Sequence, residues 1–174
     1  MKYLTKSQTF LIDRSELNKY SKTQTALNSL SEFLRYDYQK NEIETLYPEK
    51  HIHSEFETLN FLSSESPKKF HGEIQVVNRL KPHHRKIKNL NEQEKYLLFI
   101  LNFFRSDKKA LIIDGLSLLH ESNLVILNDL LLNTLPHSGK SVYLIDSKEK
   151  LWKKGFHSFE PKPLIPREID RVAS

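Results

Sequence analysis

Two short segments of the sequence carry side chains that could bind a phosphate group or a metal ion. Lys19, followed directly by Tyr20 and Ser21, places an ammonium group and two hydroxyl groups near the expected start of a helix. Asp114 places a carboxylate at the end of the apolar run 110–114. Open α/β sheets bind their ligands at the carboxyl ends of the strands, where a carboxylate can help to hold Mg²⁺. These residue types point to nucleotide chemistry.

The segments around Asp114 predict the elements that would position it. Residues 90–104 carry apolar side chains at helical spacing, residues 106–109 are polar, and residues 110–114 are apolar up to the aspartate. A strand this apolar is typical of the centre of a parallel sheet with both faces covered. We therefore expect a helix, a short turn and a central strand that ends in a carboxylate.

Other parts of the chain predict further strands and helices. Residues 9–12, 43–47 and 141–146 favour strands, and residues 123–135 favour a helix that is too apolar for a single buried stripe. The remaining predicted elements are a helix that ends near Tyr38, with Leu30 and Leu34 on its apolar face, a short helix at 56–62 and a strand at 70–78. The predicted fold class is α/β, a mostly parallel sheet flanked by helices.

Composition narrows the functional classes. The 174 residues are 38% hydrophobic and 28% charged, as in an ordinary soluble domain. The absence of cysteine excludes disulfides and thiolate catalysis. The sequence contains neither an apolar run of membrane-spanning length nor a signal-peptide core, so we expect a cytoplasmic protein. The net charge of +5 and the basic stretch 81–88 permit contact with nucleic acid or acidic lipid.

The order of these segments resembles the ABC-type ATPase (nucleotide-binding) domain of the P-loop NTPase superfamily. Leu90-Asn91-Glu92-Gln93-Glu94 stands where that family has the signature loop Leu-Ser-Gly-Gly-Gln/Glu. Residues 111–115 stand where it has an apolar strand and Asp-Glu, with Asp114 at the metal-binding Walker B position. The resemblance implies a P-loop NTPase-like sheet with a shortened helical subdomain, and a dimeric mode of action.

The segment that corresponds to the phosphate-binding loop departs from the family pattern. Asp13 and Asn18 take the two glycine positions, Lys19 keeps the lysine, and Tyr20 takes the position of the magnesium-binding Ser or Thr. The chain has four glycines, none close to another, although a loop that cradles phosphate needs glycine where its backbone approaches the anion. Lys19, Tyr20, Ser21 and Asp114 therefore predict weak nucleotide binding at most.

Three further family positions are changed. Gly115 replaces the glutamate that polarises the attacking water, and Ser147 stands at the place of the switch histidine. Glu121 replaces the aspartate that closes the dimer-contacting loop, which is a conservative change. Phosphoryl transfer depends on positioned donors, metal and a water-orienting group, so these losses favour a domain without catalytic residues.

The sequence thus predicts a catalytically silent ABC ATPase-like subunit that binds another protein, such as an active ABC ATPase, a membrane complex or a second copy of itself. No cofactor is expected, with ATP and Mg²⁺ left open, and no metal ligands are identified. The location would be cytoplasmic, with the inner face of a membrane as an option. One alternative is a nucleic-acid-associated degenerate P-loop protein, and another is a weak nucleotide binder without efficient hydrolysis.

Residues 1–155 would form one domain, and the Pro-rich tail 156–174 would be extended or partly disordered.

Overall fold

The computed structural model describes residues 7–15, 30–31, 34–35, 37–47 and 90–147, and the structural statements below concern these residues. Several predictions from the sequence fall outside them. These are the proposed nucleotide ligands Lys19, Tyr20 and Ser21, the elements at 56–62 and 70–78, the basic stretch 81–88, the shortened helical subdomain and the tail 156–174. They remain predictions.

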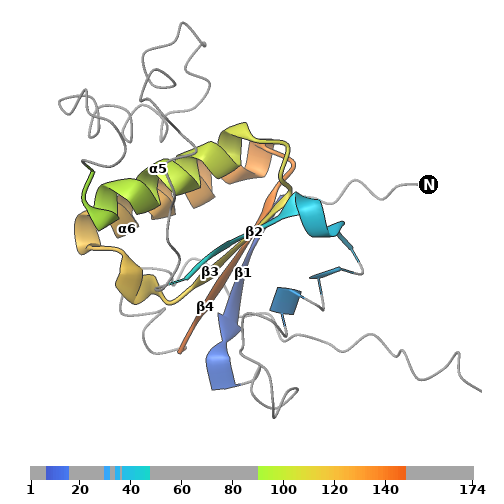
Figure 1. Cartoon of the computed structure of the whole chain (residues 1–174), viewed down its shortest axis with the longest axis horizontal. Coiled ribbons are helices and arrows are strands. Elements are labelled where there is room, and N and C mark those ends of the chain that lie inside the picture. The colour runs from blue at the N-terminus through green and yellow to red at the C-terminus, as the bar shows by residue number, and fades with distance from the viewer. Residues whose placement is uncertain (1–6, 16–29, 32–33, 36, 48–89, 148–174) are drawn as a thin grey trace, which may run out of the picture.

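A parallel four-stranded sheet forms the centre of the described fold (Figure 1). Its strands are β1 (Gln8–Asp13), β2 (Ile43–Leu46), β3 (Ala110–Asp114) and β4 (Ser141–Asp146), in the order β1-β4-β3-β2. All three neighbouring pairs are parallel. The four strands expected at 9–12, 43–47, 110–114 and 141–146 are confirmed, with only the ends of β1 and β2 shifted by one residue. The α/β class with a parallel sheet is therefore correct.

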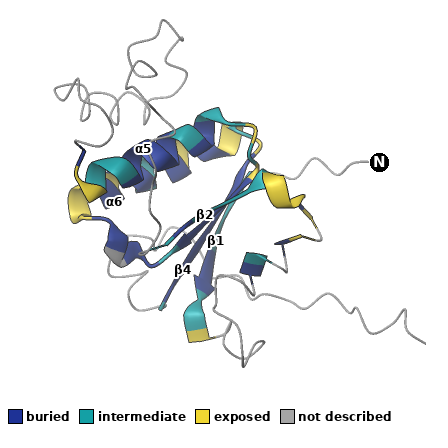
Figure 2. Ribbon diagram, viewed as in Figure 1, coloured by how far each residue is buried: buried dark blue, intermediate teal, exposed yellow. Residues whose placement is uncertain are grey.

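One face of the sheet packs against helices that come from the second half of the chain (Figure 1). They are α5 (Glu92–Arg105) and a continuous helical segment made of α6 (Glu121–Asp129), the π-helical η5 (Leu130–Thr134) and the 3₁₀ turn η6 (Leu135–His137). Two further 3₁₀ turns are η1 (Lys40–Glu42) and η4 (Leu116–Leu118). Figure 2 shows the buried side of α5 turned to the sheet. None of the described helices is long and apolar enough to cross a membrane.

The other face of the sheet is covered as well. Leu30, Leu34 and Tyr38 form a second apolar cluster with sheet residues such as Ile112 and Tyr143. The Tyr143 ring also stacks on that of Phe10, with centroids 4.6 Å apart. Residues 110–113 of β3 are consequently fully buried. This two-sided burial explains why the strand is apolar without alternation, as its sequence predicted.

The second predicted helix differs from expectation at both ends. Its sequence pattern placed a helix at 123–135, but α6 begins at Glu121 and the winding changes to a π-helix at Leu130. A π-helix is wider than an α-helix and shifts the side chains that follow it around the axis. Leu131 and Thr134 remain buried through this change, whereas Leu132 is exposed. Apolar residues on several sides of the segment concealed the change of winding in the sequence.

The amino-terminal edge of the sheet is held by Lys140. Its buried ammonium group donates hydrogen bonds to the carbonyls of Ser106 (2.5 Å) and Lys108, in the turn between α5 and β3. The same group lies 5.0 Å from the centre of the Phe103 ring. Burial lowers the pKa of Lys140 below its ordinary value of 10.5. This contact fixes the start of β3, whose other end carries Asp114.

Candidate functional site

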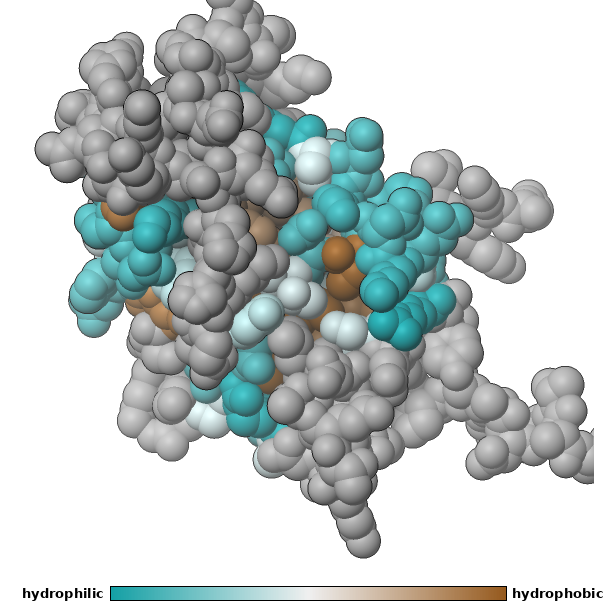
Figure 3. Space-filling model, viewed as in Figure 1, coloured by the Kyte–Doolittle hydropathy of each residue, from teal (hydrophilic) through white to brown (hydrophobic). Residues whose placement is uncertain are grey.

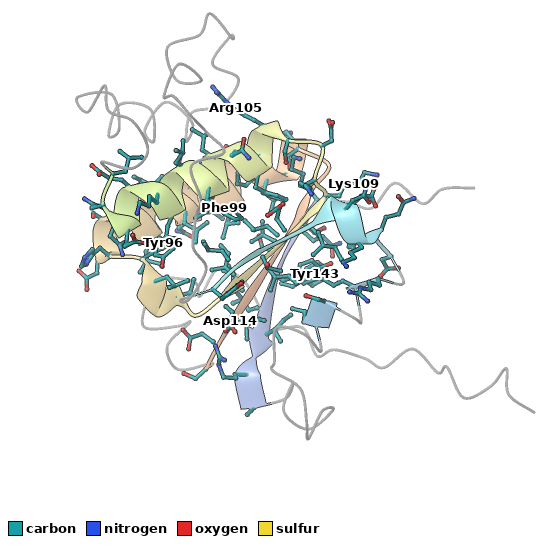
Figure 4. All side chains as sticks on the ribbon, in the orientation of Figure 1. Tyr96, Phe99, Arg105, Lys109, Asp114 and Tyr143 are labelled. Atoms are coloured by element: carbon teal, nitrogen blue, oxygen red, sulfur yellow. The ribbon has the colours of Figure 1, made fainter. Side chains whose placement is uncertain are left out.

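Three aspartates stand at the carboxyl ends of three neighbouring strands. Asp13 ends β1, Asp146 ends β4 and Asp114 ends β3. Asp13 and Asp146 are direct register partners, and Asp114 pairs with Ile145, one residue before Asp146. Figure 4 shows Asp114 and Lys109 at opposite ends of β3, so the aspartates share the edge away from the lysines of the α5–β3 turn. This is the edge where parallel sheets bind ligands.

An arginine neutralises one of these carboxylates. The guanidinium group of Arg14, directly after β1, forms an ion pair with Asp114. Because β4 lies between β1 and β3, and neighbouring strands are about 4.8 Å apart, the arginine side chain spans the end of β4. The side chains of Arg14 and Asp114 are 42% and 14% exposed. The Asp114 carboxylate therefore already has a cation beside it.

The other two aspartates accept hydrogen bonds from the backbone. Asp13 accepts one from the amide of Ser15 at 2.8 Å, at the point where β1 ends and the backbone becomes helical. Asp146 is buried and accepts bonds from the amides of Leu116 (3.1 Å) and Ser147 (2.8 Å). Each carboxylate at this edge thus has a partner within the chain. Among the described residues, no group of three or more His, Asp or Glu side chains is arranged to hold a metal ion.

The loop after Asp114 depends on a glycine. Gly115 adopts φ 87° and ψ 103°, a conformation that side chains other than hydrogen strongly disfavour. Its amide donates to the carbonyl of Ile145 at 2.9 Å, and the next amide, that of Leu116, donates to Asp146. The chain therefore turns across the end of β4 immediately after β3. A glutamate at position 115 would be strained in this backbone.

The signature-like segment forms the beginning of α5. The Asn91 side chain accepts a hydrogen bond from the Glu94 amide, and the Glu94 carboxylate accepts one from the Asn91 amide, each at 2.9 Å. This capping box explains why the helix begins at Glu92. Glu92 pairs with Lys95 at 2.7 Å, and Leu90 is buried in the core. The side chains of Asn91, Glu92 and Glu94 thus serve the helix itself.

Gln93 connects this segment to the loop after Asp114. Its amide nitrogen donates to the carbonyl of Leu118, and its amide oxygen accepts from the His120 amide (2.8 Å) and the Asn123 side chain (3.1 Å). The carbonyl of Leu118 requires a donor and the amide of His120 requires an acceptor, so only one orientation of the Gln93 amide satisfies both. The beginnings of α5 and α6 are thereby joined.

Of the residues that the sequence analysis selected, the structure thus connects Asp114, through its loop, with the segment Leu90–Glu94. It adds Arg14 and Asp146, which the sequence reasoning did not select. Asp146 had the same signal as Asp114, an aspartate that ends an apolar strand. Arg14 had no comparable signal, because its role depends on the strand order that brings residues 14 and 114 together.

Comparisons with known proteins found no matching family model, no matching curated protein and no matching solved structure.

Proposed function

We propose that this chain is a catalytically silent, ABC ATPase-like domain that acts as a structural or regulatory binding subunit of a larger complex. The observation that carries the proposal is the ion pair between Arg14 and Asp114. In an active P-loop ATPase, the carboxylate at the position of Asp114 helps to hold Mg²⁺. Here a guanidinium group lies beside that carboxylate, so a metal ion would have to displace it.

The strand order supports the ABC-like part of the proposal. β4 lies between β1, which is followed directly by helical backbone at Arg14 and Ser15, and β3, which ends at Asp114. ABC-type domains likewise have an additional strand between their Walker A and Walker B strands. Both helices beside the site, α5 and α6, also begin at the carboxyl edge, since α5 leads into β3 and α6 follows it.

The backbone at Gly115 supports the loss of catalysis. The family's water-polarising glutamate would stand at this position, where φ is 87°. The loop is built for glycine, and its two following contacts, to Ile145 and Asp146, depend on that turn. A glutamate at this position therefore conflicts with the local fold.

Binding to another protein is supported by the surface of the α6–η5 segment. Val125 (66% exposed) and Leu132 (44% exposed) are large apolar side chains that this segment leaves uncovered. In Figure 3 the described residues that can be seen are mainly hydrophilic, with small hydrophobic areas between them. If the partner is a second copy, the double variant Val125→Ser/Leu132→Ser should abolish dimers in sedimentation experiments without lowering stability by more than about 0.5 kcal/mol. A wild-type chain that stays monomeric would contradict self-association.

The test of catalytic silence is calorimetric titration with Mg-ATP and Mg-ADP, together with an ATP hydrolysis assay. Lys19→Ala is the control for the loop, and Asp114→Asn is the control for the edge described above. We expect no hydrolysis in any of the three proteins. Hydrolysis by the wild-type chain that either substitution abolishes would refute the proposal. Binding without hydrolysis that Lys19→Ala removes would instead favour the weak nucleotide binder.

A further inference from the structure

The contacts of Gln93 lead to an inference about how the candidate site is held. We propose that Gln93 is a positioning residue that fixes residues 115–120, the loop after Asp114, in a single conformation. Through this loop it would couple the exposed beginnings of α5 and α6 to the carboxyl edge of the sheet. The inference deepens the proposed function. It rests on that proposal in one respect, which is that the edge around Asp114 is taken as the functional site.

The loop is attached at two separate places. On the sheet side, the amides of Gly115 and Leu116 donate to Ile145 and Asp146 of β4. On the helix side, the carbonyl of Leu118 and the amide of His120 bond to the Gln93 side chain. The hydrogen bonds on the helix side therefore depend on the side chain of a single residue, which belongs to another element.

Leu118 and Leu119 also pack in the core beside α5 and α6, but the described hydrogen bonds between residues 118–120 and α5 all involve Gln93. The side chain of His120, the N-cap of α6, makes no capping hydrogen bond, so the helix start is not fixed by its own cap. Asn123 is fully buried and uses its side-chain amide nitrogen on Gln93, while its oxygen has no hydrogen-bond partner. Asn123 therefore reinforces Gln93 and has no alternative partner that would hold it in place.

The surface around this junction is open to a partner. Glu92 precedes Gln93 on α5 and is exposed, and His120, Glu121 and Ser122 at the start of α6 are exposed as well. A molecule bound there would contact the two segments that Gln93 joins. Its effect would reach Leu116, and then Asp146 at the end of β4, through the loop.

Amide hydrogen exchange measured by NMR tests this inference without any ligand. Gln93→Leu keeps the size of the side chain and removes all three hydrogen bonds, whereas Gln93→Glu keeps the acceptor for His120. Asn91→Ala is the matched control, because it removes the cap of α5 but none of the described bonds to residues 118–123. The amide of Ile112, in the centre of β3, reports global unfolding.

In Gln93→Leu, we expect exchange of the His120 and Leu116 amides to accelerate about five- to tenfold relative to Ile112. Gln93→Glu should keep the protection of His120, and Asn91→Ala should leave both amides unchanged. Faster exchange of the His120 amide alone would overturn the inference. It would show that the bond between Gln93 and His120 protects only that amide and does not position the loop. If Gln93→Leu does not fold, amide exchange in the wild-type protein tests the inference instead. The amides of Leu116 and His120 must then exchange through one shared opening equilibrium. None of these results depends on nucleotide binding, so the inference and the proposed function can fail separately.

Discussion

Arg14 and Asp114 are 100 positions apart in the sequence and form an ion pair across the end of β4. The contact exists because the strand order places β4 between β1 and β3, which leaves the arginine to reach over the intervening strand. The ion pair fixes the chain where it leaves β1. It also neutralises the Asp114 carboxylate, which is the more buried of the two charged groups. The pair therefore affects both the stability of the edge and its capacity to bind a cation.

A double-mutant cycle on this pair should give a small coupling energy. Arg14 is 42% exposed, so we expect a coupling of about 0.5–1 kcal/mol between Arg14→Ala and Asp114→Asn in urea unfolding. Arg14→Ala should cost more than Asp114→Asn, because it leaves a mostly buried carboxylate without its cation. The control is Lys95→Ala, whose partner Glu92 is 63% exposed, with an expected cost under about 0.5 kcal/mol. A coupling of zero would mean that the ion pair does not hold the edge.

Gly115→Glu restores the family's residue but should not restore activity. We expect it to destabilise the fold by roughly 1–3 kcal/mol, because φ of 87° with ψ of 103° strains any side chain. Gly139→Ala is the matched control, since Gly139 also has positive φ (70°) but has no atom within 4 Å of an added methyl group. Its cost should be smaller, about 1 kcal/mol. Equal stability of Gly115→Glu and wild type in urea unfolding would contradict the strain. ATP hydrolysis by the variant would contradict the expectation that this one residue does not restore activity.

The sheet could be predicted from the sequence because its strands are short apolar runs with clear polar boundaries. Both β3 and β4 were predicted with their observed ends, and each ends in an aspartate. The start of α5 was predicted two residues early, since Leu90 continues the apolar pattern while Asn91 caps the helix. Hydrophobic periodicity detects buried faces, and the capping box determines the boundary.

The contacts of the candidate site could not be predicted in the same way. Arg14 looks like any charged residue after a strand, and its partner is defined only by the strand order. Gln93 was selected as part of a signature-like loop, but its hydrogen bonds go to Leu118, His120 and Asn123 of its own chain. Polar contacts between distant segments leave no periodic pattern in a sequence. The roles proposed for Lys19, Tyr20 and Ser21 stay predictions, since these residues lie outside the described part.

Tyr143 should make the protein sensitive to high pH. Burial, with the neighbouring Tyr38 as a second cause, raises the pKa of Tyr143 far above its ordinary value of 10.0. The folded state therefore keeps a proton that the unfolded state releases, and stability falls as pH rises above about 10, by up to about 1.4 kcal/mol per pH unit. Tyr143→Phe removes the ionisable hydroxyl, together with its hydrogen bonds to Tyr38 and Ser141. Any advantage of the wild type over Tyr143→Phe in unfolding free energy should thus shrink or reverse as the pH rises from about 9 to about 11, on either side of the ordinary tyrosine pKa. A constant difference would show that Tyr143 ionises equally in both states.

Lys140 should contribute to stability through its two backbone acceptors. Lys140→Met keeps a long apolar side chain at this buried position. It removes the ammonium group that donates to the carbonyls of Ser106 and Lys108 and lies over the Phe103 ring. Hydrogen bonds from a charged group contribute about 1.5–3 kcal/mol, and the energy needed to bury the ammonium group offsets part of that. We expect a net loss of about 1–2 kcal/mol in urea unfolding.

Lys109→Met is the matched control for Lys140→Met. Lys109 lies in the same turn but is 52% exposed and pairs with Glu42 at the surface, so its loss should cost less than about 0.5 kcal/mol. If Lys140→Met is as stable as this control, the free energy needed to bury the ammonium group equals the stabilisation from its hydrogen bonds to the two carbonyls. In that case packing of Phe103, rather than Lys140, would hold the turn that leads into β3 and thereby places Asp114.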